Sequence, residues 1–134
     1  MKRVWRAIII VVVIIISVFL WCVFAPGLSV VVTEVKRLPS PDNKVEAVLV
    51  SRNAGATGAS YDIIVLPKGQ KHQNAKKWLI AFTASHVRDL NFNWKSPKEL
   101  EITYKEADIY GYRNLIYPFP EDYYYSVRVK EKQE

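Results

Sequence analysis

The chain opens with a long run of apolar positions. Residues 7–25, AIIIVVVIIISVFLWCVFA, contain no charged side chain, and a helix of roughly 20 apolar residues spans a bilayer core of ~30 Å. In lipid the helix satisfies its own backbone polar groups, so the weak helix propensity of β-branched residues matters little. Because the run exceeds the ~7–15 residues typical of a signal-peptide core, we expect an uncleaved anchor, with a cleaved signal peptide as the alternative.

Charge at the two ends of this run predicts its orientation. Lys2, Arg3 and Arg6 directly precede the run, and basic flanks stay in the cytoplasm. Pro26 and Gly27 follow it and are expected to end the helix, since proline has no amide donor. This topology predicts a single-pass protein of the plasma membrane, the inner membrane of a bacterium. The expected segments are a cytoplasmic basic flank at 1–6, a transmembrane signal anchor at 7–25, an extracytoplasmic domain at 26–130 and a frayed tail at 131–134.

After the anchor, apolar and polar positions alternate with the period of a strand. Leu100, Ile102 and Tyr104, for example, alternate with charged or polar neighbours, as is typical of antiparallel strands with one solvated face. Six or seven strands suffice for a small sandwich. We therefore expect an all-β fold, a small antiparallel sandwich or curled meander, after one N-terminal transmembrane helix. The expected strands are residues 28–37, 45–52, 61–66, 78–83, 90–95, 99–105 and 123–130.

Composition narrows the class of protein. Half of the 134 residues are hydrophobic, which excludes a disordered or collagen-like chain. One cysteine and two histidines exclude an internal disulfide and leave too few ligands for a structural zinc site. The formal net charge is +6, but three of the 19 basic residues precede the anchor, so residues 25–134 carry +3. Such a balance is ordinary for a soluble domain and does not indicate nucleic-acid binding.

Three motifs follow one another along the extracytoplasmic segment. They are S-P-D-x-K at residues 40–44, G-A-T-G at 55–58 and W-x-S-P-x-x-L-x-I-x-Y at 94–104. Together with the anchor, they resemble a family of small uncharacterised bacterial membrane-anchored proteins, and this resemblance implies a location and a fold rather than an activity. The two Ser-Pro turns, each feeding an alternating strand, are also similar to blade hairpins of TolB-like β-propellers. A propeller needs ~4 or more blades, so we expect blade-like hairpins, or ordinary Ser-Pro connectors, rather than a propeller.

Few residues could support catalysis. A nucleophile needs a neighbouring base that a third group holds in place. His86 follows Ser85, and Ser60 lies in a loop of small residues. Glu99 and Glu101 would share one face of a strand and are expected to be solvated there. We therefore expect no catalytic residue, no metal site and no cofactor. A small envelope hydrolase that uses His86 or the two glutamates is the enzyme alternative.

Tyrosines and small residues supply the candidate binding surfaces. Tyr and Arg are enriched at protein contacts, and the C-terminal third of the chain is rich in Tyr. Since only alternate residues of a strand face the core, we expect Tyr124 to point away from Tyr123 and Tyr125. The small side chains of residues 53–60 would let the backbone of a partner approach closely. The expected partner contacts are Tyr112, Arg113, Tyr117, Tyr124, Asn53, Gly55, Thr57 and Gly58.

These patterns favour a non-enzymatic binding module that is tethered to the bilayer through residues 7–25 and has a protein partner. A tether raises the local concentration of the module near partners at the membrane. One concrete form is an immunity-type inhibitor that intercepts a toxin acting in the envelope, and an accessory subunit of an envelope complex fits equally. A third class is lipid or glycan sensing, because the basic loop at residues 67–77 could contact anionic head groups. Its lysines are Lys68, Lys71, Lys76 and Lys77.

Overall fold

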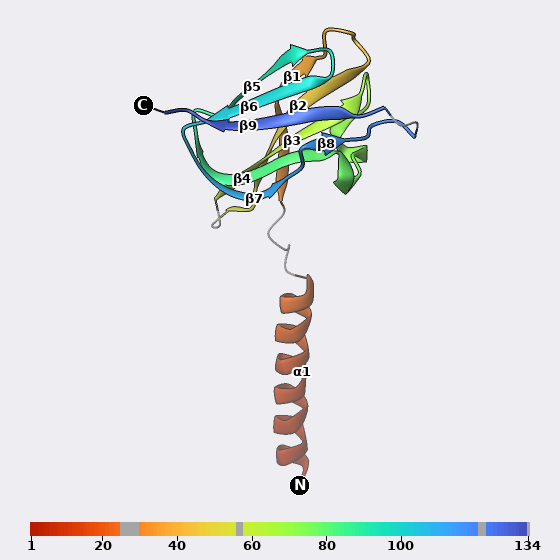
Figure 1. The fold of residues 1–134 in the computed structure, drawn as a ribbon. Coiled ribbons are helices and arrows are strands. Elements are labelled where there is room, and N and C mark those ends of the chain that lie inside the picture. Colours follow the sequence, from red (N-terminus) through yellow and green to blue (C-terminus); the bar gives the residue numbers. More distant parts are fainter. Residues whose placement is uncertain (25–29, 56–57, 121–122, 134) are drawn as a thin grey trace.

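The computed structural model describes residues 1–24, 30–55, 58–120 and 123–133, and it shows one helix followed by a β domain (Figure 1). Helix α1 (Lys2–Phe24) contains a segment, Arg3–Val23, that is long and apolar enough to cross a membrane. None of this segment is buried inside the protein. The expected N-terminal apolar helix is therefore confirmed, while its predicted end at Pro26 and Gly27 lies outside the described residues.

The strands of the described residues form two sheets. In spatial order, the first sheet contains β1 (Val31–Pro39), β2 (Val45–Asn53), β3 (Ala59–Pro67), β4 (Ile80–Arg88) and β7 (Glu106–Tyr112). The second sheet contains β5 (Asn91–Ser96), β6 (Glu99–Tyr104), β9 (Tyr125–Glu131) and β8 (Leu115–Ile116). The β3–β4 connection, residues 68–79, includes two short 3-10 helices, η2 (His72–Asn74) and η3 (Lys77–Leu79).

The all-β class is confirmed, with four differences in detail among the described residues. Strands β7 and β8 raise the number to nine, and the alternation pattern missed β7 because almost every position of this edge strand is exposed. Strands β6 and β9 pair in parallel, whereas the other pairs are antiparallel. Strand β9 extends to Glu131, the first residue of the expected tail. Strand β4 begins at Ile80, so Trp78 lies in η3 rather than on a strand.

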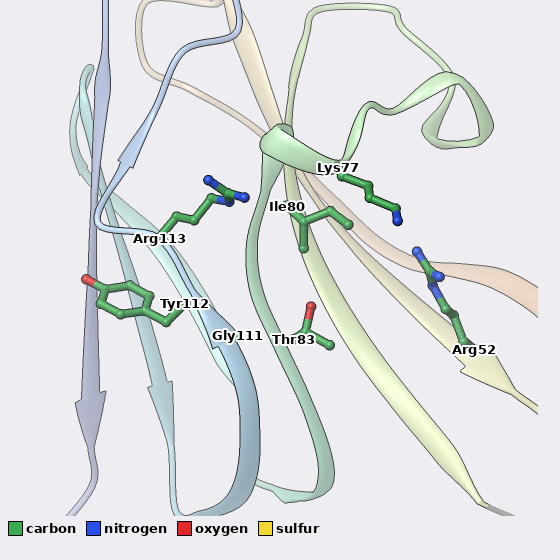
Figure 2. A pocket seen from close by; sticks show the side chains of 7 residues that line it. All are labelled: Arg52, Lys77, Ile80, Thr83, Gly111, Tyr112 and Arg113. Atoms are coloured by element: carbon green, nitrogen blue, oxygen red, sulfur yellow. The ribbon is translucent and has the colours of Figure 1, made fainter.

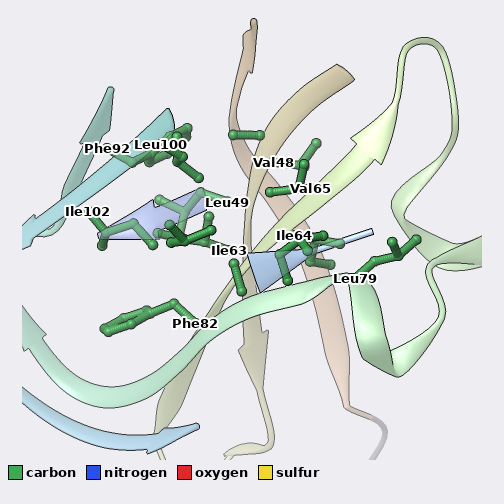
Figure 3. Close-up of a cluster of buried hydrophobic side chains, with 14 of the residues drawn as sticks. Val48, Leu49, Ile63, Ile64, Val65, Leu79, Phe82, Phe92, Leu100 and Ile102 are labelled. Atoms are coloured by element: carbon green, nitrogen blue, oxygen red, sulfur yellow. The ribbon is translucent and has the colours of Figure 1, made fainter. Parts of the chain in front are cut away.

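The core lies between the two sheets (Figure 3). Every position of β2 from Val45 to Val50 is buried, so this central strand is covered on both faces. Aromatic side chains join the sheets, because the rings of Phe82 and Tyr104 lie 6.2 Å apart between centroids. The largest fully buried side chains come from both sheets and include Tyr125, Phe82, Phe92, Ile63, Leu66, Leu100, Ile102 and Ile116.

The register of the first sheet shows which residues lie beside Val31, the first residue of β1 and so the start of the sheet after α1. Val31 pairs with Asn53, which pairs with Ala59, and the next position, Ser60, pairs with Ser85. Only seven residue steps separate Val31 from the end of α1 at Phe24, and they reach at most about 25 Å. We call this end of the first sheet the anchor-proximal end.

Candidate functional site

The expected partner contacts lie in three separate places. Tyr117 and Tyr124 lie together, Tyr112 and Arg113 border a recess, and residues 53–55 and 58 lie at the anchor-proximal end. Thr57 is outside the described residues. The sequence thus selected residue types that gather at contacts, but it did not predict which of them the fold brings together.

The first place is an exposed group of aromatic side chains. Tyr117 follows β8 and Tyr124 precedes β9, and their rings lie 6.2 Å apart at 56°. Both are about half exposed, as is Trp78 from η3. Trp78 and Tyr117 border a recess of about 370 Å³ together with Pro118, Phe119 and Pro120. We call Trp78, Tyr117, Tyr124 and residues 118–120 the aromatic surface.

Two of these residues test the sequence analysis. Tyr124 is 50% exposed whereas Tyr125 is fully buried, so the expected opposite orientation of these neighbours is confirmed. Trp78 is not among the expected contacts, because residues 78–83 are expected to form a strand with Trp78, Ile80 and Phe82 on one face. Its ring instead lies 4.7 Å from the Lys76 ammonium, and the dense lysines around it were the signal of an exposed loop.

The second place is a recess of about 450 Å³ between β2, β4, β7 and η3 (Figure 2). Tyr112 is directed toward β9, where its hydroxyl donates to the Val127 carbonyl. Burial raises the pKa of this hydroxyl. The hydroxyl of Tyr112 therefore links the two sheets instead of being available to a partner. We call this the cationic recess; it is lined by Arg52, Lys77, Ile80, Thr83, Gly111, Tyr112 and Arg113.

Ion pairing differs among the cations of the recess. Arg52 lies 2.6 Å from the carboxylate of Asp62, which is almost completely buried, and Thr83 donates to the same carboxylate at 2.8 Å. Arg52 is therefore needed to compensate a buried charge. For Lys77 and Arg113, no carboxylate lies within ion-pair distance among the described residues.

A network of charged side chains fixes the β3–β4 connection, which supplies both surfaces. Arg37 bridges Glu34 and Glu46, at 2.8 Å and 2.5 Å. The His72 ring contacts Glu34 at 3.2 Å, and Glu46 accepts the Gly69 amide. The hydrogen bond from Arg37 holds the pKa of Glu34 below its usual value. This network links β1 and β2 to the segment that carries Lys77 and Trp78, and no pattern in the sequence indicates it.

The third place, at the anchor-proximal end, contains the possible nucleophile–base pair. Ser85 Oγ lies 3.2 Å from His86 Nδ1, and Asp108 lies 2.9 Å from the same nitrogen. A relay needs the acid and the nucleophile on different ring nitrogens. Moreover, the side chains of His86 and Asp108 are 79% and 65% exposed. Ser85, His86 and Asp108 thus lie within hydrogen-bond distance, as the enzyme alternative requires. Because Ser85 and Asp108 contact the same ring nitrogen, however, they form a solvated hydrogen-bond cluster rather than a catalytic triad.

The two glutamates of β6 are held in ion pairs. Glu99 contacts Arg128 at 2.8 Å, and Glu101 lies between Lys95 and Lys130 at 3.0 Å and 2.6 Å. Hydrogen bonding from Lys130, and then from Lys95, lowers the pKa of Glu101. A general acid in a glycosidase needs the opposite shift, so Glu101 does not suit that role.

The small-residue loop has a structural use for its glycines. Gly55 and Gly58 adopt φ values of +71° and +82°, which other residues rarely adopt. The Asn53 side chain accepts the Gly55 amide at 2.9 Å, as in an Asx turn. The loop therefore needs glycine to turn the chain, which explains its composition without a partner.

The described residues contain no cluster of three or more His, Cys, Asp or Glu side chains that could hold a metal ion. Fold and site define the class of protein as a two-sheet β domain behind a helix able to span a membrane. No protein-family model matches the chain, and no curated protein or solved structure matches it significantly. The resemblance to small membrane-anchored bacterial proteins stays a prediction.

Proposed function

We propose that the chain is a single-pass, membrane-tethered module whose β domain lies outside the cytoplasm and binds a protein partner. The observation that carries this proposal is the aromatic surface. Trp78 and Tyr117 line one recess, the Tyr124 ring lies beside that of Tyr117, and each of the three residues is about half exposed. Aromatic residues of this kind dominate the energetics of protein interfaces when a partner covers them.

The location follows from the helix and its flanks. Helix α1 is apolar over a membrane-spanning length, and Arg3 and Arg6 lie at its N-terminal side. Basic residues at that side favour a cytoplasmic N-terminus. The β domain would then face the periplasm or the cell exterior, attached to the bacterial inner membrane.

The partner would itself reside at or reach the membrane. The seven residue steps between α1 and β1 keep the domain close to the bilayer and raise its concentration for such partners. An immunity-type inhibitor of an envelope-acting toxin and an accessory subunit of an envelope complex both use this arrangement. The exposed aromatic surface supports protein binding in either case.

The test is partner capture by the full-length chain from detergent-solubilised membranes. The double variant Tyr117→Ala/Tyr124→Ala removes the two paired rings, and we expect it to recover at least about tenfold less partner than the wild type. Tyr110→Ala is the matched control, since Tyr110 is an exposed tyrosine on β7 that does not border the aromatic surface. Equal recovery by all three proteins would contradict the proposal.

A further inference from the structure

The cationic recess points to the chemistry of the partner. We propose that it binds an acidic, carboxylate-bearing segment of the protein that contacts the aromatic surface. This inference rests on the proposed function, because it identifies what the same partner offers beside the aromatic side chains.

The recess is lined by positive charge. Arg52, Lys77 and Arg113 border it, and Asp62 compensates only Arg52. Elsewhere in the described residues, several surface cations have carboxylate partners, among them Arg88, Arg128 and Lys130. Figure 2 shows the side chains of Lys77 and Arg52 extending toward one another. Since Arg52 is already paired with Asp62, the uncompensated charges of the recess are those of Lys77 and Arg113 among the described residues, and a bound anion would compensate them.

The side chains of Arg113 and Lys77 are hydrogen-bond donors that suit a carboxylate. The guanidinium of Arg113 offers a planar fork that matches a carboxylate, and the ammonium of Lys77 adds a point charge. The backbone amide of Arg113 donates to the Ala81 carbonyl at 2.9 Å, which fixes the position from which this side chain extends. With about 450 Å³, the recess has room for an acidic side chain.

The recess is open at Gly111. A Cβ atom added to this residue would meet no other atom within 4 Å, so the space above it is open to a ligand. Gly111 pairs with Thr83 on β4, which places this open position among the residues that line the recess. A larger side chain here would fill the space without removing a charge.

The recess adjoins the aromatic surface, which favours a protein as its ligand. Lys77 lines the recess and the next residue, Trp78, belongs to the aromatic surface, so the two surfaces meet at η3. A continuous surface with arginine and aromatic side chains is typical of the energetic centre of a protein interface.

Peptide binding to the full-length chain in phosphatidylcholine nanodiscs tests the inference. The probe is a fluorescein-labelled, glutamate-rich peptide, its glutamine analogue is the neutral control, and anisotropy reports binding. We expect the wild type to bind the glutamate peptide at least about tenfold more tightly than the glutamine analogue, because charged hydrogen bonds are the stronger ones. Arg113→Glu is expected to abolish this preference.

Two further variants distinguish binding in the recess from a general effect of net charge. Lys132→Glu changes the net charge by the same amount at an exposed position near the C-terminus and should change peptide affinity by less than about twofold, as expected for a distant screened charge. Gly111→Leu keeps all charges and should weaken binding by filling the recess, with circular dichroism confirming the fold. If Arg113→Glu and Lys132→Glu weaken binding equally, the recess is not the site.

The remaining outcomes distinguish the sources of the anion. Displacement of the peptide by inorganic phosphate but not by free glutamate would overturn the acidic-peptide assignment, as would displacement by phosphatidylglycerol added to the nanodiscs. Partner capture that persists in Arg113→Glu, with no peptide binding by the wild type, would overturn this inference alone. Peptide binding without any tyrosine-dependent capture would contradict only the proposed function.

Discussion

At the scale of single residues, Tyr125 shows how burial changes the chemistry of a side chain. Its side chain is fully buried in the core, where its ring packs edge-on against Trp94 with the centroids 6.0 Å apart. Burial, followed by the negative charge of Asp42, raises the pKa of Tyr125 to about 12 from its ordinary 10.0. The folded state therefore favours the neutral phenol.

We predict that alkaline pH destabilises the domain through this residue. Because the folded-state pKa is the higher one, the stabilisation is complete below pH 10 and is lost as the pH rises through about 12. The loss can reach about 3 kcal/mol. Urea unfolding of the full chain in micelles at pH 9 and pH 12 measures it. Tyr125→Phe removes the ionisable group and should lose less stability; an equal loss in both proteins would refute this role.

The ion pairs of Arg52 and Arg88 contribute differently to stability. Arg52 compensates Asp62, whose side chain is only 3% exposed, whereas Arg88 and Glu106 form an exposed pair. An exposed pair contributes little to stability, but a buried carboxylate without its partner is costly. Arg52 therefore stabilises the fold, whereas Lys77 and Arg113 have no carboxylate within ion-pair distance among the residues that the structure describes.

At the scale of elements, β1 and β2 have similar valine-rich sequences but different environments. Strand β1 is at the edge of the first sheet, and its first six positions are exposed; strand β2 is central, and its first six positions are buried. The C-terminal end of β1 contacts β5, because the Trp94 indole donates to the Leu38 carbonyl at 3.1 Å. Position in the sheet, rather than residue type, decides which valines stabilise the domain.

A pair of valine substitutions tests this difference. Val48→Ala on β2 removes two buried methyl groups and should lower the free energy of unfolding by about 2 kcal/mol, from lost transfer energy and the cavity left behind. Val32→Ala on β1 should change it by less than about 0.5 kcal/mol, as for most exposed positions. Denaturant unfolding of the full chain in micelles measures both. Equal losses would show that β1 is covered in solution.

At the scale of the whole molecule, the orientation of the helix decides which compartment the β domain meets. Cys22 is the only cysteine, so a Cys22→Ser background allows one reporter thiol at a time. In intact cells, a membrane-impermeant maleimide should label Lys132→Cys, in the domain. It should label Arg3→Cys only after permeabilisation, because the basic flank is expected in the cytoplasm. The reverse pattern would refute the orientation, and recovery of the chain in the soluble fraction would refute the anchor.

The sequence by itself determined what depends on local patterns. The uncharged run at residues 7–25 has the length of a bilayer, and this length does not depend on any other part of the chain. The alternation of Leu100 with Ile102, or of Tyr124 with Tyr125, fixes which side chains face a core, because successive residues of a strand point to opposite faces. These patterns sufficed for the helix, the all-β class and the exposed tyrosine at position 124.

Only the tertiary structure decided which elements are neighbours. The parallel pairing of β6 with β9, and the meeting of Arg52, Lys77 and Arg113 around one recess, join segments far apart in the chain. A period of two specifies the face of a strand but not the strand beside it. The cationic recess therefore has no signature in the sequence, because its cations come from β2, from η3 and from the residue after β7, and the strand order of the first sheet brings them together.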